Sequence, residues 1–168
     1  MDEFVNATLL IGGNMGDSIE LCKQATGLIN KYLGNITSLS AFYCSEAWGF
    51  EAEQSFVNQA IIISAGLQPT ELLDKALKIE SMLGRTRGGE GYSPRTMDID
   101  IIFYGNEIID TPQLTIPHPR MHLRNFVLVP LCEIMPEFVH PVLGKTIEQL
   151  LRECPDNGEV KAINNVKK

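Results

Sequence analysis

Paired cysteines, long apolar segments and excess positive charge are all missing from this sequence. Its 4 cysteines form no CxxC pair and no zinc-like spacing, which argues against a disulfide framework or structural zinc and fits a reducing, cytoplasmic environment. No apolar run approaches the roughly 20 residues that span a bilayer, so we expect no membrane contact. The net charge of -7 argues against nucleic acid as a partner, because binding a phosphate backbone requires an extended basic surface.

Positive charge is nevertheless concentrated in one stretch of the chain. Five of the six arginines, and no lysine, lie between Arg85 and Arg124. The same stretch contains the run Asp98-Ile99-Asp100. Carboxylates of this kind hold magnesium, and guanidinium groups hold phosphoryl oxygens in fixed directions. The stretch therefore predicts a site for a metal-bound polyphosphate.

The length of 168 residues fits a single domain, which we expect over 1–168 with a polar, frayed tail from about residue 155. Apolar periodicity and capping signals predict strands at 8–12, 36–43, 56–65 and 97–104, a short strand at 107–109, helices at about 18–33 and 69–83, and extra helices at 123–133 and 146–153. The β-α-β-β-α-β order predicts an α+β, ferredoxin-like fold with an antiparallel sheet in one layer and helices in the other.

The Asp98 and Asp100 side chains are predicted to share one face of a strand, because residues two apart in a strand point the same way. The opposite face would then hold Met97, Ile99, Ile101 and Phe103. A solvated edge strand is the alternative interpretation of this pair. Arg95 directly upstream favours a metal site, in which substrate phosphates complete the magnesium shells.

Glu80 is predicted to lie at the edge of the apolar face of its helix, where a carboxylate needs a partner. Two readings remain open: direct contact with a ligand, or a structural ion pair with Arg85 or Arg87. Either arrangement would position the arginines.

His118 lies between two prolines that restrict the backbone, and arginines follow it closely. Such a histidine can donate to a phosphate oxygen, although a loop histidine usually has no such task. The irregular segment 45–55, which contains Trp48, is predicted to be a binding loop.

Six motifs together resemble the 6-hydroxymethyl-7,8-dihydropterin pyrophosphokinase family of folate biosynthesis. They lie at 10–14, 45–50, 54–58, 84–87, 94–100 and 116–121, and the similarity extends over about residues 8–152. The resemblance implies a ferredoxin-like monomer that transfers the β,γ-pyrophosphate of ATP to the hydroxymethyl oxygen of 6-hydroxymethyl-7,8-dihydropterin and releases AMP.

The resemblance implies a role for each matching polar residue. Asp98 and Asp100 would hold two magnesium ions (Mg²⁺) that bridge the ATP phosphates. The catalytic arginines that stabilise the transferred group correspond to Arg85 and Arg95. The ATP-binding positions of the family correspond to Glu80, Arg87, Ile101, Thr115, His118 and Arg124.

A pterin site is also implied by the resemblance. Asn58 corresponds to the residue that hydrogen-bonds the ring edge, and Phe56 and Phe126 correspond to an aromatic sandwich. Ala47 and Trp48 would offer backbone groups. Core packing is the alternative role for the two phenylalanines.

One loop departs from the best-known bacterial pattern of the family. Gly91 and Tyr92 stand where that pattern has an Arg-Trp pair, so one phosphate-binding cation is absent and Tyr92 offers a smaller stacking ring for the pterin. Two other functions would also use parts of this pattern: a non-catalytic ligand sensor, and a two-metal phosphodiesterase. Neither accounts for Trp48, Phe56 and Asn58.

Overall fold

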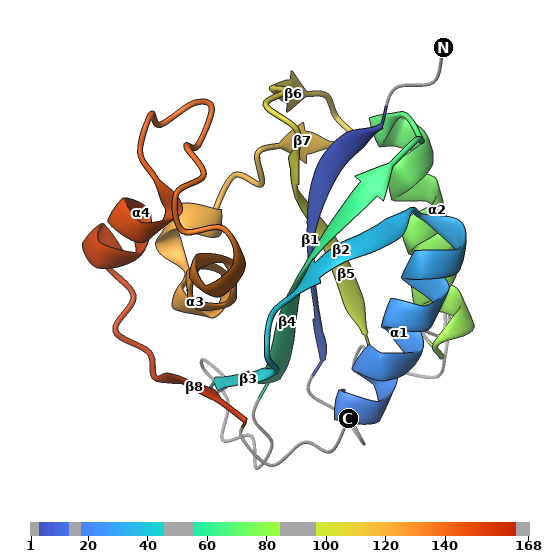
Figure 1. Cartoon of the computed structure of the whole chain (residues 1–168), viewed down its shortest axis with the longest axis horizontal. Helices are drawn as coiled ribbons and strands as arrows, with labels where there is room; N and C mark the ends of the chain where they lie inside the picture. Colours follow the sequence, from blue (N-terminus) through green and yellow to red (C-terminus); the bar gives the residue numbers. More distant parts are fainter. Residues whose placement is uncertain (1–3, 14–17, 46–55, 85–96, 164–168) are drawn as a thin grey trace.

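The computed structural model describes residues 4–13, 18–45, 56–84 and 97–163 (Figure 1). Its strands are β1 (Val5–Gly13), β2 (Asn35–Leu39), β3 (Tyr43–Ser45), β4 (Phe56–Ala65), β5 (Asp98–Tyr104), β6 (Ile109–Asp110), β7 (Thr115–Ile116) and β8 (Val160–Ala162). Its helices are α1 (Ser18–Tyr32), α2 (Pro69–Met82), the 3-10 turn η1 (Met121–Leu123), α3 (Asn125–Ile134) and α4 (Ile147–Glu153). The predicted helices are confirmed, with the one expected at 123–133 divided by Arg124 into η1 and α3. None of the helices described here is long and apolar enough to cross a membrane.

A mixed α/β architecture surrounds one antiparallel sheet. The sheet runs in the order β5-β1-β4-β3-β8, and β2 also pairs with β4. β1 is the inner strand between β4 and β5, and its last seven residues are all buried, so it forms the centre of the core. β6 and β7 form a separate two-stranded sheet.

Helices cover both faces of the sheet: α1 and α2, the helices of the predicted β-α-β-β-α-β order, share one face, and the two extra helices lie on the other. α1 and α2 pack on one face through residues such as Ile29 and Ile79, and α3 and α4 pack on the other through Leu128, Leu131 and Ile147 (Figure 1). The position of the two extra helices was not predicted, and the apolar faces of α3 and α4 need a core of their own. The sheet supplies it on the side away from α1 and α2.

A β-bulge in β5 changes the face on which one predicted core residue lies. Thr8 pairs with Phe103 and Leu9 pairs with Ile101, so Ile102 is the extra residue. An extra residue shifts the alternation of side chains beyond it. Ile99 and Ile101 therefore face α1 and α2 as predicted, whereas Phe103 packs in the core under α3, which contradicts its predicted face.

The strand predicted at 36–43 is divided into β2 and β3 by the residues around Ser40. The Ser40 hydroxyl accepts from the backbone N–H of Ala60 at 2.9 Å, and it donates to the carbonyl of Ala41. A side chain that satisfies strand groups in this way competes with regular pairing. Glu133 of α3 secures the break, because its carboxylate accepts from Ala41 N at 3.0 Å and from the Tyr43 hydroxyl at 2.7 Å. Partial burial, and then this carboxylate, raise the pKa of Tyr43 to about 12.

The C-terminal tail is ordered where fraying was predicted. Residues 156–158 hydrogen-bond to the start of α3, and β8 pairs with β3. The expectation of a frayed tail rested on polar composition alone. These polar groups find partners in the fold, and residues 164–168 lie outside the described part of the chain.

Candidate active site

Three neighbouring strands bring two of the predicted site residues into one row. Gly12 of β1 pairs with Asn58 of β4 on one side and with Asp98 of β5 on the other. Directly paired residues place their side chains on the same face of an antiparallel sheet. With strands about 4.8 Å apart, the Asn58 and Asp98 Cα atoms are about 10 Å from each other. Gly12, between them, has no side chain of its own to separate the two.

The two carboxylates of β5 share a face, as predicted. Ile99 between them is buried, whereas Asp98 is half-buried and Asp100 is exposed. Asp100 pairs with Leu10, which belongs to the core under α3, so both acids point to the α3 side of the sheet. Hard carboxylate oxygens two residues apart on a rigid strand fit the donor set that magnesium prefers.

Glu80 connects α2 to the strand that carries these acids. It is 4% exposed, and its Oε2 accepts from the backbone N–H of Ile99 at 2.7 Å. A buried carboxylate must be satisfied by hydrogen bonds, and this one fixes the backbone between Asp98 and Asp100. The predicted partners Arg85 and Arg87 lie outside the described residues.

Asn58 has a buried polar atom that the described residues do not satisfy. The side chain is 8% exposed, and its Nδ2 donates a long hydrogen bond of 3.5 Å to the carbonyl of Ile11. Its Oδ1 is buried without a hydrogen-bond partner among the residues described. Buried polar atoms in native proteins almost always have a partner, so this oxygen is suited to accept from a bound ligand.

Gly12 provides the space in which the Asn58 side chain lies. A Cβ on Gly12 would be 2.1 Å from Asn58 Nδ2 and 2.6 Å from the carbonyl oxygen of Val57. No side chain fits at such distances, so glycine is required here. The sequence placed this glycine at the end of the predicted strand 8–12 without a role in the site, and only the pairing with Asn58 across the sheet reveals that role.

His118 is held in one tautomer beside β5. Its backbone N–H donates to the carbonyl of Ile102 at 3.0 Å, and its Nδ1 accepts from the Arg120 N–H at 3.3 Å. An Nδ1 that accepts leaves the proton on Nε2, which can then donate to an anion. Burial, and then Arg124 and Arg120, lower the pKa of His118. The imidazole is therefore a neutral donor near pH 7.

The lowered histidine pKa values predict how stability depends on pH. Burial is the main cause of the lowered pKa of both His118 and His140. As pH falls below about 6.5, the unfolded chain binds protons on these histidines before the folded chain does. We therefore expect the melting temperature to fall between pH 7.5 and pH 5.5, and to fall less steeply in His118→Asn. Equal pH slopes for the two proteins in thermal melts would contradict the lowered pKa of His118.

The start of α3 carries two further predicted site residues. The Arg124 guanidinium lies over the Phe126 ring, 5.6 Å from its centroid, and both residues are half-buried. Phe126 packs at the edge of the core under α3, so core packing accounts for part of its surface. Phe56 is half-buried and lies two residues before Asn58 on the same face of β4. α3 covers that face, so both phenylalanines belong to one side of the sheet.

Ile101 and Thr115, predicted to line the nucleotide, lie near the outer edge of β5. The Ile101 side chain is 5% exposed in the core under α1 and α2, so only its backbone is available to a ligand. Thr115 begins β7, which contacts β5, and it is half-buried. The other predicted site residues, Ala47, Trp48, Arg85, Arg87, Tyr92 and Arg95, lie outside the described residues.

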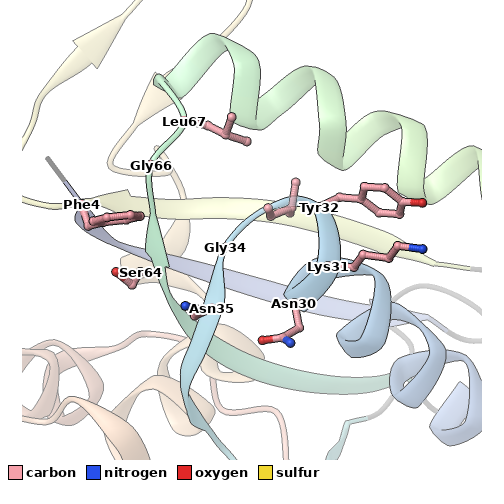
Figure 2. Close-up of a pocket in the computed structure, with 10 residues that line it drawn as sticks. Phe4, Asn30, Lys31, Tyr32, Gly34, Asn35, Ser64, Gly66 and Leu67 are labelled. Atoms are coloured by element: carbon pink, nitrogen blue, oxygen red, sulfur yellow. The ribbon is translucent and has the colours of Figure 1, made fainter. Parts of the chain in front are cut away.

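A shallow pocket elsewhere on the described surface contains none of these residues. It lies between Phe4, the end of α1 and the turn after β4, with Lys31 and Tyr32 on one side (Figure 2). Val5 pairs with Ala65 at this end of the sheet, whereas Gly12 pairs with Asn58 near the other end. The pocket is therefore separate from the Asn58–Gly12–Asp98 row.

Comparison with known proteins gives a consistent result. Residues 8–136 match the family model for 7,8-dihydro-6-hydroxymethylpterin-pyrophosphokinase, HPPK. The 2-amino-4-hydroxy-6-hydroxymethyldihydropteridine pyrophosphokinase of Synechocystis is 40% identical over 148 residues, which cover 88% of this chain and 75% of the relative. The enzyme of the same name from Bacillus subtilis is 41% identical over 129 residues, which cover 76% of this chain and 77% of the relative.

A solved structure resembles the fold as well. The Plasmodium falciparum HPPK-DHPS wild type with pterin and p-hydroxybenzoate superposes with a TM-score of 0.74 at 18% identity. The match covers 91% of this chain but 43% of that chain, so the present chain spans less than half of it. At this identity the likeness shows a common fold.

Proposed function

Since the chain belongs to the 7,8-dihydro-6-hydroxymethylpterin-pyrophosphokinase family, its reaction is pyrophosphoryl transfer to 6-hydroxymethyl-7,8-dihydropterin in folate biosynthesis, and we propose that ATP is the donor. The observation that carries this proposal is the row of Asn58, Gly12 and Asp98, with Asp100 beside it. Asn58, at one end of the row, suits a polar ring, and Asp98, at the other end, suits a metal-bound polyphosphate. The acceptor and the donor would therefore meet between Asn58 and the acids.

Asp98 and Asp100 would hold two Mg²⁺ ions together with the ATP phosphates. Their fit to magnesium rests on two oxygen donors on one face of a strand, whose backbone is secured by the Glu80 bond to Ile99 N. When bound, magnesium neutralises the charge that develops on the transferred group. Fixing the strand keeps the two carboxylates in place while substrates enter.

Other residues of the chain would orient the two substrates. His118 would donate from Nε2 to a phosphate oxygen, and Arg124 would contact the nucleotide at the start of α3. Asn58 Oδ1 would accept from the pterin ring edge, with Phe56 and Phe126 against the ring faces. Pyrophosphoryl transfer depends on in-line alignment and charge neutralisation more than on covalent catalysis, which agrees with a site built from such contacts.

Three roles belong to residues outside the described part of the chain. Arg85 and Arg95 would stabilise the transferred pyrophosphoryl group, and Arg87 would contact the nucleotide phosphates. Ala47 and Trp48 would offer backbone groups to the pterin, and Tyr92 would stack on it. Arg85 follows the end of α2 by three residues in the sequence, and the hydrogen bond of Glu80, near that end, to Ile99 N between the acids supports this role for Arg85.

We also propose that the sheet and its helices form a ferredoxin-like core. Counting β2 and β3 as one strand, the order β5-β1-β4-β3 is the order 4-1-3-2 of an antiparallel β-α-β-β-α-β sheet, which supports a ferredoxin-like core. We further propose a cytoplasmic monomer, in keeping with the unpaired cysteines.

The reaction is tested by incubating the protein with ATP, Mg²⁺ and 6-hydroxymethyl-7,8-dihydropterin and measuring AMP by chromatography. We expect one AMP for each pyrophosphorylated pterin. ATP binding without AMP formation would indicate a ligand sensor. Phosphodiester hydrolysis in the absence of pterin would indicate a phosphodiesterase. Either result would overturn the proposal.

Asn58→Ala is expected to raise the KM for the pterin by at least about 10-fold, because the side chain would no longer accept from the ring. The KM for ATP should change by less than about twofold, since Asn58 lies on the other side of Gly12 from the acids. Steady-state kinetics with each substrate varied in turn measures both values. An unchanged KM for the pterin would remove Asn58 from the site.

A further inference from the structure

The first turn of α3 has no cap from its own side chains. Arg124 occupies the N-cap position and makes no side-chain capping bond. The first N–H groups of a helix need an acceptor from elsewhere. Asp156, 31 residues further along, supplies it, because its Oδ2 accepts from the backbone N–H of Asn125 at 3.0 Å.

The Asn125 side chain completes this connection. Its Nδ2 donates to the carbonyl oxygens of Asp156 at 2.5 Å and Gly158 at 3.0 Å. The other carboxylate oxygen of Asp156 accepts from the N–H of Gly158 at 2.8 Å, which holds the turn in shape. The side chains of Asn125 and Asp156 are both half-buried. The start of α3 is therefore clamped to the segment 154–162, which we call the strap.

The far end of the strap pairs with β3, the strand that precedes the predicted binding loop 45–55. β8 pairs with β3 from Tyr43↔Ala162 to Ser45↔Val160, and the N–H of Ile163 donates to the carbonyl of Phe42 at 2.8 Å. Figure 1 shows the strap running from α4 to β3, which it joins on the side away from β4. β3 ends at Ser45, directly before the segment that contains Ala47 and Trp48. The strap thus joins α3 to this edge of the sheet.

We propose that the strap positions both substrate contacts of α3, with Asp156 as the positioning residue for Arg124 and Phe126. Asn125, which Asp156 caps, is the residue between these two. The inference rests on the proposed roles of Arg124 and Phe126. The strap lies beyond residues 8–136, which match the family model, so the family match itself assigns it no role.

Asp156→Ala tests the proposal because it should raise the KM values and leave kcat nearly unchanged. Loss of one helix cap should raise the KM for ATP and the KM for the pterin by about 3- to 30-fold. The kcat should stay within about twofold, because the metal-binding strand is untouched. Asp156→Asn keeps one acceptor oxygen and should give KM values between those of Asp156→Ala and the wild type.

Glu159→Ala is the matched control. It removes a carboxylate from the same strap, but Glu159 forms a surface ion pair with Lys161, and both side chains are mostly exposed. We expect wild-type KM values for this variant. If Asp156→Ala lowers the melting temperature but leaves both KM values unchanged in folded protein, Asp156 is merely structural and the proposal is wrong.

Two further variants separate this inference from the proposed function. Arg124→Ala should raise the KM for ATP, and Phe126→Ala should raise the KM for the pterin; if neither does, the site assignment fails. If both do while Asp156→Ala does not, the strap proposal alone fails. Should Asp156→Ala not fold, Asn125→Ala removes the side-chain half of the clamp and should also raise both KM values, and unchanged values there would overturn the proposal.

Discussion

Replacing Asp98 or Asp100 by alanine is expected to lower kcat by at least about 10²- to 10³-fold, the usual effect of losing one preorganised charge contact. Both acids lie on the face of β5 that is turned toward α3, and they are not part of either apolar core. Their removal should therefore affect the chemistry far more than the fold. Rapid-quench measurement of AMP formation at saturating ATP and pterin gives the rate of the transfer step.

Asp110→Ala is a suitable control for this result. Asp110 is an exposed acid of β6, in the separate two-stranded sheet, so its loss changes the net charge equally without touching β5. We expect wild-type kcat and melting temperature. Near-normal turnover in Asp98→Ala or Asp100→Ala would contradict a metal site at these residues.

Gly12→Ala should damage both stability and pterin binding. The added methyl group would overlap Asn58 Nδ2 and the Val57 carbonyl, and the carbonyl belongs to strand backbone that cannot turn away. Overpacking of this kind costs about 1–3 kcal/mol of unfolding free energy. Displacing Asn58 by about 1 Å should lower kcat/KM for the pterin by about 10²-fold. Urea denaturation and steady-state kinetics measure the two effects.

Gly27→Ala makes the same chemical change at a permissive place. Gly27 lies within α1, and an added Cβ would meet nothing within 4 Å. Alanine should stabilise the protein by about 0.5–1 kcal/mol, because glycine is unfavourable inside a helix. If Gly12→Ala retained full stability and pterin affinity, the close packing of Asn58 over Gly12 would be incorrect.

Local pattern was enough to predict most of the main elements. The apolar run of β1, the helical spacing of α2 and the Thr146 capping box of α4 are each encoded within a few residues. The alternation around Asp98 and Asp100 was also predicted correctly, because no irregularity falls between them. Motif resemblance supplied the identity of the reaction.

Features that depend on distant partners were not predicted. The bulge at Ile102 is set by pairing with Thr8 and Leu9, and no local signal marks it. The use of Asp156 as a cap depends on a helix that begins 31 residues earlier. The role of Glu80 was missed for a similar reason. Its partner is the backbone N–H of Ile99, and a pattern of side chains does not indicate which backbone group a carboxylate will bind.

The irregularity at Ile102 also affects how the gene can tolerate insertions and deletions. A one-residue slip of β5 against β1 at positions 98–100 would turn Asp98 and Asp100 toward α1 and α2, and would turn Ile99 toward the α3 side. Removing Ile102 itself would leave Thr8 paired with Phe103 and Leu9 with Ile101, so the acids and Phe103 would keep their present faces, and only the buried Ile102 side chain would be lost from the core under α3. A length change that shifts the register of the acids should therefore abolish activity through loss of the metal ligands, whereas deletion of Ile102 should lower stability through loss of packing under α3 and leave the metal ligands in place.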